Sequence, residues 1–216
     1  MYFIVSLLYD RNVFIICRAE KFYNGRFTYG KTGDDIISKT VIERSTAMNE
    51  KIAALLNQQI NKEFYSAYLY LDMANYYDEL DLNGFSHYYM VQAQEERDHA
   101  LLFMKYMQVN GLKVTLEAID RPDKTYAQPM DPLLAAAEHE RYVTALINDI
   151  YHEAREDHDY RTMKFLDWFV DEQMEEEDSA DSLVSRYKLF GGDPRSLYLL
   201  DQELAARVYS APNLTL

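Results

Sequence analysis

Four long segments of this 216-residue chain carry apolar residues every three or four positions, the spacing that aligns side chains along one face of an α-helix. Each segment is long enough for several helical turns and ends near a polar turn or a glycine. Four long amphipathic helices bury their apolar stripes most simply by packing against one another as a bundle. The predicted helices occupy residues 49–77, 85–110, 132–156 and 161–190.

The segment between the second and third predicted helices is unusually long. Residues 111–131 contain Pro122 and no helical stripe, and helices in bundles are usually joined by only about 2–8 residues. The segment is long enough to run the length of a bundle, so we predict a crossover. Asp131-Pro132 indicates an N-cap followed by proline at the first helical position of the third helix.

A short fifth helix is predicted to follow the bundle. Asp193-Pro194 repeats the pattern of an N-cap followed by proline, and the helix should end near Val208. We therefore predict an all-α fold, a four-helix bundle with a long crossover between helices two and three and a short fifth helix. The main domain spans residues 48–208, and residues 209–216 form a tail.

The charge of the chain restricts the classes of partner. Its formal net charge is −14, which argues against nucleic acid and against an anionic membrane surface and favours cations. The single Cys17 excludes an intrachain disulfide and a multi-cysteine zinc site. We expect a cytoplasmic protein.

Residues 1–47 differ in character from the rest. They contain seven Lys and Arg and five Asp and Glu, a net charge of +2, so residues 48–216 carry −14 − 2 = −16. Their apolar runs are interrupted by Asp10-Arg11 and are too short to span a membrane. We interpret residues 1–47 as a non-homologous extension, translated from a misassigned start; the alternative is a genuine regulatory or targeting arm.

Charged and amide side chains interrupt every apolar stripe near its middle. The stripe of the second predicted helix contains Glu96 and His99, which stand three residues apart and so lie on one face. A buried carboxylate without a partner costs several kcal/mol, so such groups are normally paired or bound to a metal. Singly, each residue has an ordinary interpretation as a solvated or hydrogen-bonded side chain. This interpretation does not explain why all four helices have such residues on the apolar face near mid-length. The polar residues on the four faces are Glu63; Glu96 with His99; Glu140; and Gln173 with Glu176.

This ligand set favours a particular metal chemistry. Four carboxylates with one imidazole and one amide disfavour structural zinc and copper–thiolate sites, which rely on sulfur. Calcium takes carboxylates from loops more readily than from helix cores. A pair of iron or manganese ions sharing one carboxylate fits best, and we expect redox-active iron.

The motifs resemble those of a known family. In helix order, crossover, terminal helix and local motifs, residues 48–208 resemble bacterial non-haem ferritins, members of the ferritin-like di-iron family. Haem-containing bacterioferritins have Glu-x-x-His on the fourth helix and a haem-ligating Met after the bridging Glu. This chain has Gln173-x-x-Glu176 and Arg97 at those places, so no haem is expected. The matching stretches are Leu56–Ser66, Ala93–His99, Glu138–Glu140 and Phe165–Glu176.

The resemblance implies a role for each ligand. Glu63 and His99 would hold the first iron, Glu96 would bridge, and Glu140 with Glu176 would hold the second. Gln173 would lie beside the pair and Tyr70 close to it. By the same resemblance Glu95, Glu172 and Glu175 would form a third iron position that shares Glu176; their ordinary interpretation is a solvated acidic face.

Other positions are less informative. An acidic turn at Glu156, Asp157 and Asp159 matches an iron-entry channel at a threefold contact in the family, or is an ordinary turn. Trp168 is interpreted as a packing residue. His139 is one residue from Glu140, about 100° round the helix, and so should face elsewhere.

The function implied is iron storage with ferroxidase activity. Fe(II) would be oxidised by O2 or H2O2 at an intrasubunit di-iron site, and Fe(III) mineral would be stored in a hollow homo-oligomeric cage of twenty-four subunits. One alternative is a non-storing, rubrerythrin-like di-iron oxidase or peroxidase, although the chain has no cysteine cluster for an electron-transfer iron centre. Another is a structural subunit of mixed cages, against which the complete ligand set argues.

Overall fold

The computed structural model describes residues 22–23, 26–27 and 48–215. The chain divides into two units, Met1–Arg44 and Ser45–Leu216. In the first unit the described residues form two short antiparallel strands, β1 (Phe22–Tyr23) and β2 (Arg26–Phe27). Cys17 lies outside the described residues, as does most of the predicted extension, so its interpretation stays a prediction.

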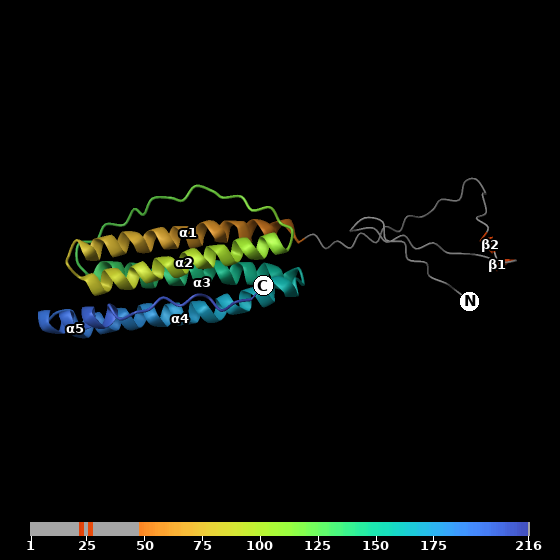
Figure 1. Ribbon diagram of the computed structural model, residues 1–216. Helices are drawn as coiled ribbons and strands as arrows, with labels where there is room; N and C mark the ends of the chain where they lie inside the picture. Colours follow the sequence, from red (N-terminus) through yellow and green to blue (C-terminus); the bar gives the residue numbers. More distant parts are fainter. Residues whose placement is uncertain (1–21, 24–25, 28–47, 216) are drawn as a thin grey trace. The chain divides into compact units, whose positions relative to one another are not determined.

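The second unit is the predicted four-helix bundle. Figure 1 shows four long helices side by side, with the segment between α2 and α3 running along the outside for the length of the bundle. α1 pairs mainly with α2 and α3 with α4, while α5 contacts α2 and α4. Among helices of residues 48–215, none combines the length and the apolar character needed to span a lipid bilayer. The helices are α1 (Glu50–Asp78), α2 (Asn83–Val109), α3 (Met130–Glu156), α4 (Tyr160–Phe190) and α5 (Pro194–Leu204).

Two predicted helix ends were wrong. α3 begins at Met130, so Asp131 is not its N-cap; the Asp131 carboxylate instead accepts hydrogen bonds from the backbone N–H groups of Ala127 and Gln128. The aspartate thus stabilises the turn that ends the crossover, because its short side chain reaches backbone groups just before it. α5 ends at Leu204 rather than near Val208, since the chain then turns back along the bundle.

The crossover is fastened to α1 by two asparagines. Asn57 donates to the carbonyl of Thr115 and accepts from its N–H, at 2.9 and 2.8 Å. One turn further along, the Asn61 side chain donates to the carbonyl of Ala118. A segment without regular structure leaves its backbone groups unpaired, and these amides supply partners for some of them.

The N-terminus of α2 is capped by a residue of α5. Leu82, at the N-cap position, makes no side-chain hydrogen bond there. The buried Asp201 carboxylate instead accepts from the backbone N–H groups of Gly84 and Phe85, at 2.7 and 3.1 Å. A Cβ at Gly84 would stand 1.7 Å from the Asp201 carbonyl oxygen, so only glycine permits this approach. Asp201 satisfies two of the N–H groups that a helix start leaves free.

The bundle core consists of two apolar clusters with a polar layer between them. The cluster nearer α5 is rich in aromatic residues and includes the stacked Tyr77 and Tyr89. The other cluster includes Phe103, Phe165 and Phe169. Of the eleven buried polar side chains among the described residues, Thr162 and Asp201 lie elsewhere. The other nine lie where the two clusters meet: Gln59, Glu63, Ser66, Gln92, Glu96, His99, Glu140, Gln173 and Glu176.

Candidate metal centre

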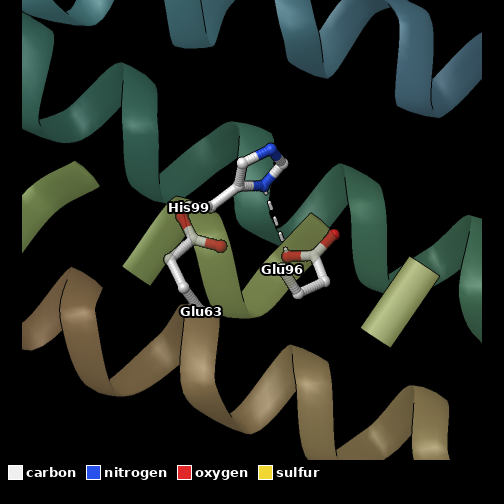
Figure 2. A group of neighbouring side chains, drawn as sticks. All are labelled: Glu63, Glu96 and His99. Atoms are coloured by element: carbon white, nitrogen blue, oxygen red, sulfur yellow. Dashed lines mark ion pairs between the residues drawn. The ribbon is translucent and has the colours of Figure 1, made fainter. Parts of the chain in front are cut away.

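Three ionisable side chains from α1 and α2 converge in the polar layer. Glu96 and His99 share one face of α2 because they are three residues apart, and Glu63 reaches them from the neighbouring α1. Their ligand atoms all lie within 4.8 Å of one another, and each side chain is buried. Figure 2 shows the carboxylates of Glu63 and Glu96 on either side of the group, with the His99 ring between them. Within the described residues this is the one compact group of metal-ligand side chains.

The protonation of this group follows from its burial. Burial and the adjacent Glu96 raise the pKa of Glu63 to about 8. Burial also favours the neutral form of Glu96, but nearby His99 outweighs it and leaves the pKa of Glu96 below its usual value. Burial lowers the pKa of His99, and the carboxylates of Glu172 and Glu96 more than reverse this. At neutral pH the group therefore holds a neutral Glu63 beside a charged Glu96–His99 pair.

The two nitrogens of His99 have different neighbours. Nδ1 lies 3.7 Å from Glu96 Oε2, and Nε2 lies 3.7 Å from Glu172 Oε1. The ring is held edge-on by Trp168 and Phe169. One nitrogen thus faces the compact group, while the other faces a carboxylate. This is the arrangement that orients a metal-ligating histidine.

The second half of the polar layer comes from α3 and α4. The Glu140 carboxylate accepts from the Tyr70 hydroxyl and, at 3.3 Å, from the Gln173 amide. Glu176 accepts from the Gln92 amide at 2.8 Å. Burial, Glu96 and Glu176 raise the pKa of Glu140 well above its usual value. Burial and Glu96 raise the pKa of Glu176 to about 7.

Gln92 connects the two halves, because its amide nitrogen also lies 3.3 Å from Glu96 Oε1. Glu140 and Glu176 both interact electrostatically with Glu96, although they lie outside the compact group. Glu63 Oε2 has no hydrogen-bond partner despite its burial. Four buried carboxylates around one imidazole are unfavourable without cations or protons, and their oxygen-rich donor set fits two divalent iron or manganese ions.

The three glutamates predicted for a third metal position have different surroundings. Glu172 is half-buried and faces His99, and Glu175 is exposed. Glu95 is half-buried and forms a 2.5 Å ion pair with Arg207 in the C-terminal segment. In this structure the three residues do not gather into a compact group with Glu176.

The remaining candidates have mostly structural contacts. Asp159 caps the start of α4 by accepting from the Thr162 N–H and hydroxyl, and exposed Asp157 accepts from Asn49. His139 lies outside the compact group, with Nε2 2.7 Å from the Ser66 hydroxyl. Glu156 is exposed.

Sequence reasoning assigned no role to three residues that the structure places at the site. Gln59 donates to Glu63 at 2.8 Å and stands one turn before it on α1, so its helix face was a usable signal. Gln92 stands four residues before Glu96 and was visible in the same way. Arg207 had no such signal, because its contact with Glu95 joins positions 112 residues apart.

A crossover-connected bundle with buried carboxylates from all four helices and one histidine defines the class of helical di-metal carboxylate proteins. Comparison with known proteins identifies the branch: residues 53–190 match the family model of the ferritin-like domain. The chain belongs to the ferritin family.

Individual relatives agree with this assignment. The chain is 34% identical over 163 residues to a bacterial non-heme ferritin of Staphylococcus epidermidis, covering 76% of this chain and 98% of the relative. It is 36% identical over 155 residues to a bacterial non-heme ferritin of Campylobacter jejuni, covering 72% and 93%. Among solved structures, an open-pore ferritin from Archaeoglobus fulgidus superimposes with a TM-score of 0.74 at 41% identity, covering 76% of this chain and 99% of that one.

Proposed function

We propose that this protein oxidises Fe(II) at a di-iron site inside each subunit and stores the Fe(III) product as mineral within a hollow oligomeric cage. The observation that carries the proposal is the buried polar layer. It contains carboxylates from all four long helices and one imidazole, with Glu63, Glu96 and His99 already within ligand distance of one another. Membership of the ferritin family and relatives named bacterial non-heme ferritins support it.

Each ligand has a proposed role. Glu63 and His99 hold the first Fe(II), and Glu96 bridges to the second. Glu140 and Glu176 hold the second Fe(II), consistent with their place on α3 and α4 opposite the compact group. The bridging carboxylate keeps both ions together so that one oxidant, O2 or H2O2, takes an electron from each.

Protons leave the site as iron enters. In the metal-free state Glu63 and Glu176 have raised pKa values of about 8 and about 7, so both are substantially protonated at neutral pH. Fe(II) binding replaces these protons, since only the ionised carboxylates are good ligands. Iron affinity should therefore increase with pH across this range.

Two neighbours position the second ion. Tyr70 donates its hydroxyl hydrogen bond to Glu140, and Gln173 donates its amide to the same carboxylate. These bonds fix the orientation of Glu140 before metal arrives, which is the usual function of groups behind a metal ligand. We therefore assign Tyr70 and Gln173 as positioning residues.

The storage part of the proposal concerns assembly. The ferritin relatives and the superimposable Archaeoglobus fulgidus ferritins support an oligomeric cage. We propose a homo-oligomer of twenty-four subunits. Glu95, Glu172 and Glu175 would take iron onward from the di-iron pair, and the acidic turn at Glu156, Asp157 and Asp159 would admit iron from outside.

Aerobic Fe(II) loading tests the proposal. The protein is loaded with increasing iron, then sized and assayed for iron per particle. A large particle that retains far more iron than its number of sites indicates storage. Oxidation without retention would instead indicate a non-storing oxidase, and no oxidation would indicate a structural subunit; either result would reject the proposal.

A site variant tests the ligand assignment. Replacing Glu96→Ala together with His99→Ala should leave a folded assembly that has lost rapid Fe(II) oxidation. The matched control is Glu138→Ala, which removes an exposed carboxylate from α3 whose side chain is 80% exposed. Rapid oxidation retained in the double variant would show that the site lies elsewhere.

A further inference from the structure

The C-terminal segment after α5 folds back onto the bundle. In Figure 1 residues 205–215 run from α5 along α4 toward the opposite end. The Trp168 indole donates to Asn213 at 2.9 Å, and Leu214 packs against the apolar cluster of that end. The Tyr209 hydroxyl donates to Asp98 on α2. This segment is therefore fixed across the surface formed by α2 and α4.

Arg207 joins this segment to Glu95, the residue before Glu96 on α2. Its Nη2 lies 2.5 Å from Glu95 Oε2, and the two side chains are only 22% and 14% exposed. The guanidinium stacks over the Tyr88 ring at 4.1 Å, and Nη1 donates to the Tyr88 carbonyl at 3.3 Å. The Arg207 carbonyl is itself 2.8 Å from His87 Nε2. Several contacts thus hold one cation against one carboxylate in a partly desolvated place.

Glu95 is close to the residues of the metal centre. It directly precedes Glu96 on α2, and its side chain is largely buried. The guanidinium therefore pairs with the carboxylate that is next in sequence to a member of the compact group.

We infer that Arg207 is a built-in competitor for the third metal ion: its guanidinium occupies the Glu95 carboxylate, and a metal ion binds there only by displacing it. This rests on the proposed function, because it concerns iron leaving the same centre. A carboxylate cannot give its full charge to an arginine and to a metal ion at once. Arg207 weakens the third position while leaving Glu63, Glu96 and His99 free to bind the first ion.

The consequence is a threshold in the order of filling. The two ions of the pair bind first, and a third ion enters only when the iron supply is high enough to displace the guanidinium. A fixed arginine differs from a mobile counter-ion, since its stacking on Tyr88 and its hydrogen bonds hold it in place. The segment 205–215 thereby regulates how readily iron moves beyond the pair.

An anaerobic Co(II) titration of the assembled protein tests this inference. Binding is monitored by calorimetry and by visible absorption. Arg207→Gln should tighten the third Co(II) equivalent per subunit about tenfold, an effect of the size that coupling between contacting charged groups typically has. Affinity for the first two equivalents should stay within about twofold. The matched control is Arg186→Gln, which breaks an arginine–glutamate pair on the exposed side of α4 and should change neither.

The Glu95→Gln background makes the test specific. Arg207→Gln should have no effect on the third equivalent once Glu95 is neutral. Arg207→Lys keeps the charge but loses the planar stack on Tyr88, and should give an intermediate affinity; it also serves if the glutamine variant does not assemble. Size-exclusion chromatography verifies assembly of each variant.

The outcomes separate the inference from the proposed function. An unchanged third equivalent in Arg207→Gln, or a tightening that persists with Glu95→Gln, would overturn the role of Arg207 while leaving the pair intact. Failure of the wild-type protein to bind the first two equivalents would overturn the proposed function, and the inference with it.

Discussion

The buried carboxylate of Glu63 offers a quantitative test of the site in the absence of metal. We consider the replacement Glu63→Gln, which keeps the size of the side chain and can still accept the hydrogen bond from Gln59. The wild-type carboxyl has a pKa of about 8 in the folded protein, against an ordinary value of 4.5. The folded state therefore binds a proton that the unfolded chain has released across the pH range between these values.

The direction in which pH changes the stability of the wild-type protein follows from proton linkage. A carboxyl whose pKa is raised by folding is neutral in both states below about pH 4.5, so it costs little there. As pH rises toward 8, the wild-type protein loses stability, because the unfolded state gains by ionising while the folded state cannot. The amide introduced by Glu63→Gln does not titrate, so the variant escapes this loss.

The magnitude can be worked from the same two pKa values. Each pH unit between them is worth about 1.4 kcal/mol, and the shift spans roughly 3.5 units, a total of about 5 kcal/mol per subunit. Between about pH 5.5 and pH 8.5 the stability advantage of the glutamine variant should grow by about 3 kcal/mol.

Denaturant unfolding of chelator-treated protein at both pH values measures this growth. Changes in assembly with pH affect both proteins alike, so the difference between variant and wild type is the informative quantity. Glu138→Gln, at an exposed position, should show no such pH-dependent difference. A Glu63→Gln difference that is the same at about pH 5.5 and about pH 8.5 would refute the reasoning. Addition of Zn(II) at about pH 8.5 should stabilise wild type more than the variant.

Three further predictions concern other parts of the molecule. Asp201→Ala removes the cap of α2 and should lower the free energy of unfolding by about 2 kcal/mol, measured by denaturant titration; an unchanged midpoint would contradict the cap. Tyr70→Phe removes the hydrogen bond to Glu140 and should weaken the second Co(II) equivalent about tenfold, with the first unaffected; equal affinities in titration would argue against positioning. Glu156→Gln with Asp157→Asn should slow iron uptake, while single-turnover oxidation at saturating Fe(II) should be unchanged. Stopped-flow rates of iron uptake equal to those of wild type would reject the entry channel.

Much of the fold was predictable because the buried face of a long helix repeats many times in the sequence. The predicted stripes of α1 and α2 are buried along their whole length, from Ile52 to Ala74 and from Phe85 to Tyr106. Helix ends were less predictable: Asp131-Pro132 has the composition of a helix start, yet the aspartate bonds to the preceding turn. Local sequence cannot distinguish these two uses of one carboxylate.

The candidate site was predictable to the extent that its residues interrupt an apolar stripe. Glu63, Glu96 and His99 were identified in this way, and the structure brings them together. Contacts between distant segments gave no periodic signal. Arg207 lies beyond the fifth helix, and its partner Glu95 is fixed only once the C-terminal segment has folded back.

The cap at α2 also bears on the order in which the chain acquires its structure. Gly84 and Asp201 are 117 residues apart, so the start of α2 keeps its free N–H groups until the last helix has been synthesised and has docked. Such non-local closure delays folding relative to helix formation itself. On the ribosome α2 would therefore emerge with a frayed beginning, and completion of the bundle would wait for nearly the whole chain. A truncated product would lack the cap at the start of α2, and a quality-control protease would cleave it first at this end.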